Sequence, residues 1–385
     1  MKKIIITLIA LLLLVPLGAK DLKVLLNSNM QIREFTFLRN YAIVINKDHY
    51  YGPISKDVKL KIEAVGNKKL ALSLSYLDGN TYKYTSLGGT TSRVDVVQYL
   101  DDVDFSKTID PKVTQTSKKI TFTNKMLSQQ ILKYNSPFFT LKYKVGDEVK
   151  LNYKKGKETK KEGTIDFWGI PSFFALSDGS KKFYIVENIA LERYLDFTTN
   201  CELRKANNIE AYKAQAILAR TFALQKTEER VDQYKNHNKT LWKNFQLRPD
   251  TRDQAYICTM RVKEADEYAH PSDDIHNSVA QTNDRVLGED GELLEIYYCA
   301  YCGTCSYCTK NNCKATENGR GDCQNGIIDY AKKHNYIETL DHYHKGASLY
   351  KYNNGSLKFI QKLDNKKAEL EKNLMDAEDR LQHMI

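Results

Sequence analysis

Glu202 is a candidate for acid–base chemistry, because a carboxyl group can donate and accept a proton. It stands before Ile209–Lys226, a segment without Gly or Pro that is rich in helix formers, and we expect it in the loop leading into that helix. Asn207 and Glu210 have the spacing of a capping box at the helix start. In an apolar, partly closed site Glu202 would keep its proton near neutral pH and could protonate the oxygen of a sugar–sugar bond. Alternatively, it is a surface carboxylate or a partner of the helix dipole.

The predicted helix carries three polar side chains, Lys213, Gln215 and Arg220, on an otherwise core-like segment. Lys213 and Arg220 are seven residues apart, close to two helical turns, so they share a face. Two interpretations are open. Both cations line a groove beside Glu202, or Lys213 is a surface charge and Arg220 a buried structural cation.

Six of the eight cysteines lie within 25 residues of one another. The spacing C-x2-C-x2-C-x2-C is typical of a metal-binding loop and awkward for disulfides, because close neighbours must turn their Cβ vectors together. We predict a structural zinc site, with disulfides of an exported protein and an iron–sulfur cluster as alternatives. The expected ligands are Cys299, Cys302, Cys305, Cys308 and Cys313. Three further residues are secondary candidates: Cys323, His342 and His344.

The residues around Glu202 carry a resemblance to a known family. After Glu202 comes E-A-Y-K-A-Q-A-I-L-A-R-T-F-A-L, beginning eight positions later, and D-Q-A-Y follows at residues 253–256. Further blocks stand in the same order at residues 186–195, 291–298 and 331–346. Together they resemble the stage II sporulation protein D family, related to the amidase-enhancer proteins of bacterial cell walls. Leu203 replaces the family's usual Met, which bears on substrate preference more than on the fold.

The resemblance implies a lytic transglycosylase that cuts peptidoglycan between N-acetylmuramic acid and N-acetylglucosamine. Glu202 would protonate the glycosidic oxygen and then, as a carboxylate, take a proton from the C6 hydroxyl of the muramic acid, leaving a 1,6-anhydro end. One carboxylate suffices, whereas an ordinary glycosidase needs a second one about 5 to 9.5 Å away. The family motif implies five substrate-binding residues: Lys213, Gln215, Arg220, Gln254 and Tyr256. Tyr256 is equally well explained as a buried core residue.

Composition and the N-terminus point to an exported protein. Residues 1–19 have a basic start, an apolar run of signal-peptide length and small residues suited to cleavage. We predict a secretory signal, or else an uncleaved anchor, and an extracytoplasmic location in both cases. The net charge of +10 suits an anionic wall polymer or a membrane surface, and export argues against nucleic acid. Predicted partners are peptidoglycan glycan strands and a cell-wall amidase. In the alternative function, the protein is a non-catalytic wall-binding enhancer of that amidase.

We predict an α+β fold in four parts. After the signal come a β-rich region at 20–160, with an inserted module from about 57, and a mixed α/β catalytic core at 161–350. Residues 351–385 form a C-terminal amphipathic helix. Within the core, we expect a short helix over 272–282 followed by a hairpin, and one helix from Ile327 to Gly346.

Overall fold

The computed structural model of this 385-residue chain describes most of its sequence. The described ranges are 21–30, 32–37, 41–45, 49–98, 139–144, 162–176, 180–203, 206–237, 240–249, 252–256, 260–262, 271–311, 321–353 and 355–363. The predicted signal, residues 1–19, lies outside them. Within these ranges, no helix combines the length and apolar composition that a membrane crossing requires.

One six-stranded antiparallel sheet, sheet A, joins the N-terminal region to the predicted core. Its strands, in spatial order, are β1 (Asp21–Met30), β12 (Phe183–Ala190), β11 (Ile170–Ala175), β8 (Arg93–Gln98), β3 (Tyr41–Ile45) and β4 (His49–Ile54). The first strand of the described chain thus pairs with the strand that leads into the helices. Strands from both sides of residue 160 share sheet A, so the domain boundary predicted at that residue divides a single sheet.

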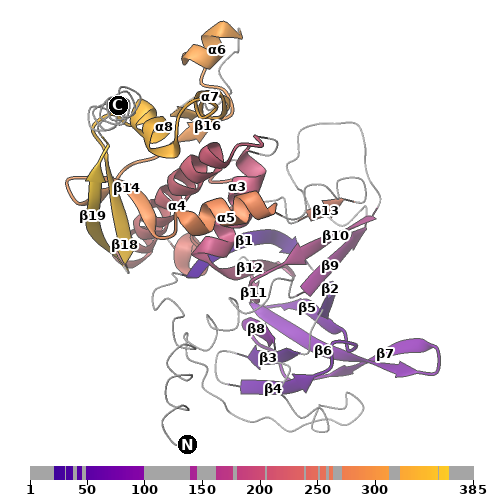
Figure 1. The fold of residues 1–385 in the computed structure, drawn as a ribbon. Coiled ribbons are helices and arrows are strands. Elements are labelled where there is room, and N and C mark those ends of the chain that lie inside the picture. Colours follow the sequence, from indigo (N-terminus) through magenta and orange to yellow (C-terminus); the bar gives the residue numbers. More distant parts are fainter. Residues whose placement is uncertain are drawn as a thin grey trace, which may run out of the picture.

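A second, seven-stranded sheet, sheet B, packs against sheet A (Figure 1). Its strands, in spatial order, are β13 (Met260–Val262), β10 (Glu162–Phe167), β9 (Phe139–Lys144), β2 (Ile32–Phe37), β5 (Leu60–Gly66), β6 (Lys69–Asp78) and β7 (Thr81–Ser86). Apolar residues alternate along β5 and β6, so one face of each strand is buried. Side chains from both sheets, such as Phe35, Ile62, Phe173 and Ile185, form a common core.

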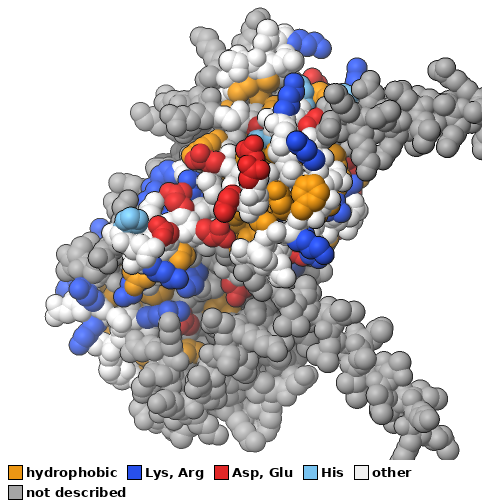
Figure 2. Space-filling model, turned by 90° about the vertical axis from the view of Figure 1, so that its left-hand side faces the viewer, with side chains coloured by type: hydrophobic (Ala, Val, Ile, Leu, Met, Phe, Trp, Pro, Cys, Tyr) orange, Lys and Arg blue, Asp and Glu red, His pale blue; other side chains and the backbone are white. Residues whose placement is uncertain are grey.

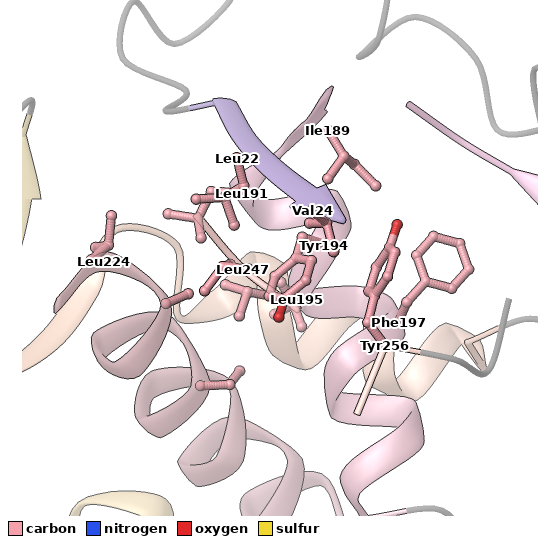
Figure 3. Close-up of a cluster of buried hydrophobic side chains, with 14 of the residues drawn as sticks. Leu22, Val24, Ile189, Leu191, Tyr194, Leu195, Phe197, Leu224, Leu247 and Tyr256 are labelled. Atoms are coloured by element: carbon pink, nitrogen blue, oxygen red, sulfur yellow. The ribbon is translucent and has the colours of Figure 1, made fainter. Parts of the chain in front are cut away.

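Three helices cover the β1–β12 edge of sheet A (Figure 1). They are α3 (Leu191–Leu203), α4 (Ile209–His237) and α5 (Asp273–Gln281), and the short η3 (Thr240–Lys243) follows α4. Figure 3 shows their core, in which Leu22 and Val24 of β1 face apolar residues of α3 and α4. This core fixes the C-terminal end of α3 relative to the rest of the molecule.

The C-terminal part contains a small sheet and three short helices. The sheet consists of β15 (Glu292–Leu293), β14 (Arg285–Glu289), β18 (Ser348–Asn353) and β19 (Ser356–Lys362). The helices are α6 (Ser306–Lys310), α7 (Gln324–Tyr330) and α8 (Tyr336–Tyr343), and the parallel pair β16 (Tyr298–Cys299) and β17 (Asp322–Cys323) lies beside them. In Figure 1 the helices α6, α7 and α8 lie at the top of the molecule, and the small sheet lies at the left, beside α4.

The structure confirms the predicted α+β class and the helix and hairpin after residue 272. The prediction of one helix from Ile327 to Gly346 is wrong, because α7 ends at Tyr330 and Asn335 starts a second helix, α8, with a complete capping box to Glu338. The C-terminal helix is wrong over 351–362, where residues form a hairpin around Gly355, whose φ is +90°. The rest of that predicted helix lies outside the described residues.

Candidate functional site

Glu202 lies in the last turn of α3 and is half-buried. The expectation of a loop position is wrong, because Leu191–Leu203 continues as a helix whose residues pack on both β1 and α4. The backbone N–H of Ala255 donates a hydrogen bond to Oε1 over 2.7 Å. The Gln324 side-chain amide donates to Oε2, also over 2.7 Å. Both oxygens of the carboxylate are therefore held by neutral N–H donors.

These two donors define the chemistry available to Glu202. Hydrogen bonds from N–H groups favour the ionised form of a carboxylate. Each carboxylate oxygen has two lone pairs, and the N–H donor described here uses one of them. The negative charge also acts on its surroundings: burial, together with Glu202, raises the pKa of Tyr298 well above its ordinary value. The geometry thus fixes the orientation of the Glu202 carboxylate and stabilises its negative charge.

The start of α4 differs by one residue from the predicted capping box. Asn208, not Asn207, accepts from the N–H groups of Glu210 and Ala211, at 2.9 and 3.1 Å. Glu210 does not reach back to the cap, since its carboxylate accepts from Lys213 Nζ and from the backbone N–H of Tyr336, each over 2.8 Å. Lys213 is therefore a partly exposed cation that pairs with Glu210.

Gln215 is fully buried on α4. Neither its side-chain oxygen nor its side-chain nitrogen has a hydrogen-bond partner among the described residues. Burying a neutral polar group without a partner costs about 1–3 kcal/mol. Gln215 is thus an unsatisfied polar group on the helix that follows Glu202.

Arg220 is also fully buried, and its guanidinium is bound by protein groups. Nε and Nη2 donate to the two carboxylate oxygens of Glu192 at 2.9 and 2.6 Å, and Nη1 donates to the Arg285 carbonyl at 3.0 Å. It ties together the start of α3, α4 and β14. These contacts match the second interpretation of the sequence, a buried structural cation, and place Arg220 away from any groove wall.

The D-Q-A-Y segment contributes to the site through its backbone. Gln254 is fully buried, accepts from the Tyr194 hydroxyl at 3.0 Å and donates to the Tyr298 hydroxyl at 2.7 Å. Tyr256 is fully buried as well, stacks on Tyr194 and donates to Glu187 (Figure 3). The expected sugar-binding side chains are thus core residues here, and Ala255 between them supplies the N–H that holds Glu202.

Four cysteines, Cys302, Cys305, Cys308 and Cys323, place their sulfur atoms within 4.8 Å of one another. Cys308 Sγ and Cys323 Sγ are 3.5 Å apart. Thiolates that bind one tetrahedral zinc at about 2.3 Å lie about 3.8 Å apart, so the spacing fits a metal centre. Cys299 does not belong to this group although it pairs with Cys323 in the β16–β17 ladder.

The other expected metal ligands lie elsewhere or outside the described residues. Cys313 is not among those residues. His344 Nε2 makes a 2.6 Å hydrogen bond with Asp322, and His342 stacks on Tyr330. Cys323, a secondary candidate in the sequence, takes the fourth position instead.

Backbone N–H groups support the sulfur atoms of the four-cysteine group. The backbone N–H of Cys305 donates to Cys302 Sγ, that of Cys308 donates to Cys305 Sγ, and that of Gly326 donates to Cys323 Sγ, over 3.2 to 3.4 Å. Burial alone would raise the pKa of the Cys302 thiol, but its N–H donors, including Thr304, lower it to about 6. Burial instead raises the pKa of the Cys305 and Cys323 thiols, despite the N–H donors that each receives.

Gln324 links this cluster to Glu202. Cys323 caps α7, and Gln324 is the first residue of that helix. It is buried and reaches Glu202, 122 residues away in sequence. In the sequence, Gln324 is only a glutamine beside a cysteine cluster, and nothing there indicates its contact with Glu202. Gln324 was therefore absent from the predicted site.

Comparison with protein families matches residues 179–288 to a family described as Stage II sporulation protein. These residues form a stage II sporulation protein D domain. The domain spans α3, α4 and α5, and so includes Glu202, Gln215 and Ala255. It ends at Gly288, before the four-cysteine group and Gln324. Comparison with curated proteins finds no match. The sporulation protein D domain indicates a role connected with the cell wall.

Proposed function

We propose that this protein is an exported lytic transglycosylase that cleaves peptidoglycan glycan strands, with Glu202 as its acid and base. The observation that carries this proposal is the position of Glu202 within the sporulation protein D domain, half-buried, with each carboxylate oxygen held by an N–H donor from a separate part of the chain. A carboxyl group fixed in this way points in one direction, which is what proton transfer to a bound sugar requires.

In the proposed reaction, Glu202 gives its proton to the glycosidic oxygen as the bond from C1 of N-acetylmuramic acid to that oxygen breaks. The C6 hydroxyl oxygen of the same sugar bonds to C1, and its proton passes to the Glu202 carboxylate. The product has a 1,6-anhydro end, no water is consumed, and Glu202 is protonated again. The Ala255 and Gln324 donors stabilise the carboxylate between the two transfers.

We further propose that the four-cysteine group binds zinc in a structural role. Four thiolates complete the coordination of a tetrahedral zinc and leave no position for water. The bound metal would fix Cys323, and hence the start of α7 and the Gln324 amide. The chemistry at Glu202 itself requires no metal.

Glycan binding is proposed for Lys213, which is partly exposed on α4. Gln215, Arg220, Gln254 and Tyr256 are assigned to the supporting core, since all four are fully buried.

Two features support an extracytoplasmic location. The N-terminal sequence is typical of a secretory signal. Cys201, the residue before Glu202, is disulfide-bonded, and disulfides persist mainly in oxidising compartments. The net charge of +10 favours an anionic partner at the wall.

A second candidate function is a non-catalytic wall-binding protein that stimulates an amidase. It is favoured by the two N–H donors on Glu202, because they stabilise the ionised form that a glycan contact would use. Purified protein incubated with glycan strands stripped of stem peptides separates the two functions. We expect 1,6-anhydromuramyl ends by mass spectrometry from the native protein and from a Glu229→Gln control, and none from Glu202→Gln. Glycan binding without new ends from any of the three would establish the second function.

A further inference from the structure

A cavity of about 460 Å³ lies beside sheet A, η3 and the later part of α4. Ten described residues line it, and four of them are basic: Lys23, Lys68, Arg93 and Lys243. None of the ten is Asp or Glu. The hydrogen bonds to Glu202 described above involve none of them. A concave site of this volume is in the range of small-molecule sites.

The four cations come from four separate elements. Lys23 is on β1, Lys68 is in the β5–β6 turn, Arg93 is on β8 and Lys243 ends η3. Bringing like charges together is unfavourable unless an anion offsets them. The convergence of these elements therefore favours an anionic occupant.

The carboxylates near these cations offset only part of the charge. Asp95 forms a bidentate pair with Arg93, at 2.9 to 3.0 Å, and the Asp21 carboxyl interacts with Lys23. Among the described residues, neither Lys68 nor Lys243 has an ion pair, and both are exposed. Two cations thus remain without a carboxylate partner at the cavity.

The conformation of Lys68 provides a second observation. Asn67 and Lys68 have φ values of 49° and 60°, in the left-handed region that favours glycine. A lysine at this turn position is strained where glycine would not be. Backbone strain of this kind is often found at ligand-binding positions.

Aromatic and amide groups complete the lining. Phe174 stacks on Tyr184, with ring centroids 5.2 Å apart, and the Arg93 guanidinium lies over the Phe174 ring, 5.1 Å from its centroid. Asn244 donates to the Tyr184 hydroxyl at 2.6 Å, and Asn188 donates to the Ile170 carbonyl at 3.0 Å. These contacts fix the amides that would face hydroxyl groups of a ligand.

On the face drawn in Figure 2, Lys and Arg side chains lie at the lower left and also at the upper right, while Asp and Glu side chains lie nearer the middle.

We propose that this cavity binds a phosphate group carried on a sugar or polyol. A phosphate monoester carries a charge of about −1.5 to −2, which suits several cations better than a single carboxylate does. The fixed fork of Arg93 and the mobile ammonium groups of Lys68 and Lys243 are the groups that commonly bind phosphate oxygens. The aromatic and amide lining would contact the carbon framework and its hydroxyls. This site goes beyond the proposed cleavage of glycan and does not depend on it.

Calorimetric titration of the full chain with glycerol phosphate at low salt tests the proposal. We expect saturable binding that weakens as salt is raised, and at least tenfold weaker binding for Lys68→Gln/Lys243→Gln. Glutamine keeps the length of each side chain and removes its charge. A Lys333→Gln/Lys358→Gln control changes two exposed lysines elsewhere and should bind like the native protein. Thermal unfolding of each variant verifies that it is folded.

Further arms identify the source of the phosphate. A glycerol phosphate oligomer that binds more tightly than the monomer supports a phosphodiester polymer, and the reverse order supports a free phosphate ester. Glu202→Gln should bind as the native protein does, so loss of cleavage and loss of this site are separable. Absence of saturable binding, equal loss in the control variant, or tighter binding of N-acetylmuramic acid than of glycerol phosphate would overturn the proposal.

Discussion

Replacing Gln324 by methionine tests how Glu202 is controlled. Methionine has nearly the same length but no N–H, so the variant lacks the donor that lies 2.7 Å from Glu202 Oε2. A hydrogen bond to a charged group contributes about 1.5–3 kcal/mol. Its loss therefore moves the protonation equilibrium of Glu202 by about ten- to a hundredfold toward the protonated form.

The sign of the pH effect follows from this change. The proposed reaction begins with protonated Glu202, so activity falls as the pH rises through its pKa. Removal of a donor to the carboxylate raises that pKa. We expect the alkaline limb of kcat/KM for Gln324→Met to shift to higher pH, with a lower maximum because the carboxyl is less well fixed.

The assay is the release of 1,6-anhydromuramyl ends from stripped glycan between pH 5 and about 9. Asn325→Leu is the matched control, since Asn325 is the next amide in α7 and donates to the Ala300 carbonyl instead. This control should leave the pH profile in place. An alkaline limb for Gln324→Met that stays fixed or moves to lower pH would refute the reasoning.

Three further predictions concern stability and metal. Gln215→Met should raise the free energy of unfolding by about 1–3 kcal/mol, measured by urea denaturation, because a buried amide without a described partner is removed. Burial, opposed by N–H donors from Gly169 and Trp168 and by Tyr256, raises the pKa of Glu187 from 4.5 to about 7. Folding stability from this group is therefore lost as the pH rises from about 4.5 to 7, and Glu187→Gln should be about 3 kcal/mol more stable than the native protein at pH 8 and similar to it at pH 4. Removal of metal by a chelator should lower the midpoint of thermal unfolding and also the activity, because Gln324 follows Cys323, a ligand in the proposed zinc site.

Each of these predictions has a contradicting result. Gln215→Met that is less stable than the native protein would show that its amide is satisfied. A native stability that does not fall between pH 4.5 and 7 relative to Glu187→Gln would show that Glu187 is ionised without cost. Activity unchanged after complete loss of metal would separate the cysteine group from Glu202.

The site residues that the sequence indicated are those whose side-chain type itself suggests a chemical role. Glu202 was singled out because a carboxyl group carries its chemistry with it, and thiols likewise indicated Cys302, Cys305 and Cys308 as ligands. Cys323, the fourth member of the group, was only a secondary candidate. Ala255 was not found, because every residue except proline has a backbone N–H and only the fold selects one. Gln324 was not found because its contact with Glu202 spans 122 residues.

The same limit explains the corrected residues. Arg220 and Tyr256 are polar residues whose burial depends on partners from distant elements, Glu192 and Glu187. The C-terminal helix was predicted from apolar spacing, but the Asn-Gly signal at residues 354–355 and pairing with β14 favour a hairpin over 348–362. Pairing and burial of this kind are tertiary properties, and spacing in one segment does not contain them.

The central claim is that Glu202 transfers a proton twice while the sugar's own hydroxyl attacks. Digestion of stripped glycan in heavy-oxygen water, read by mass spectrometry, tests it most directly. The account predicts 1,6-anhydro ends without heavy oxygen from the native protein and no new ends from Glu202→Gln. Reducing ends that carry heavy oxygen, or anhydro ends formed equally well by Glu202→Gln, would contradict it.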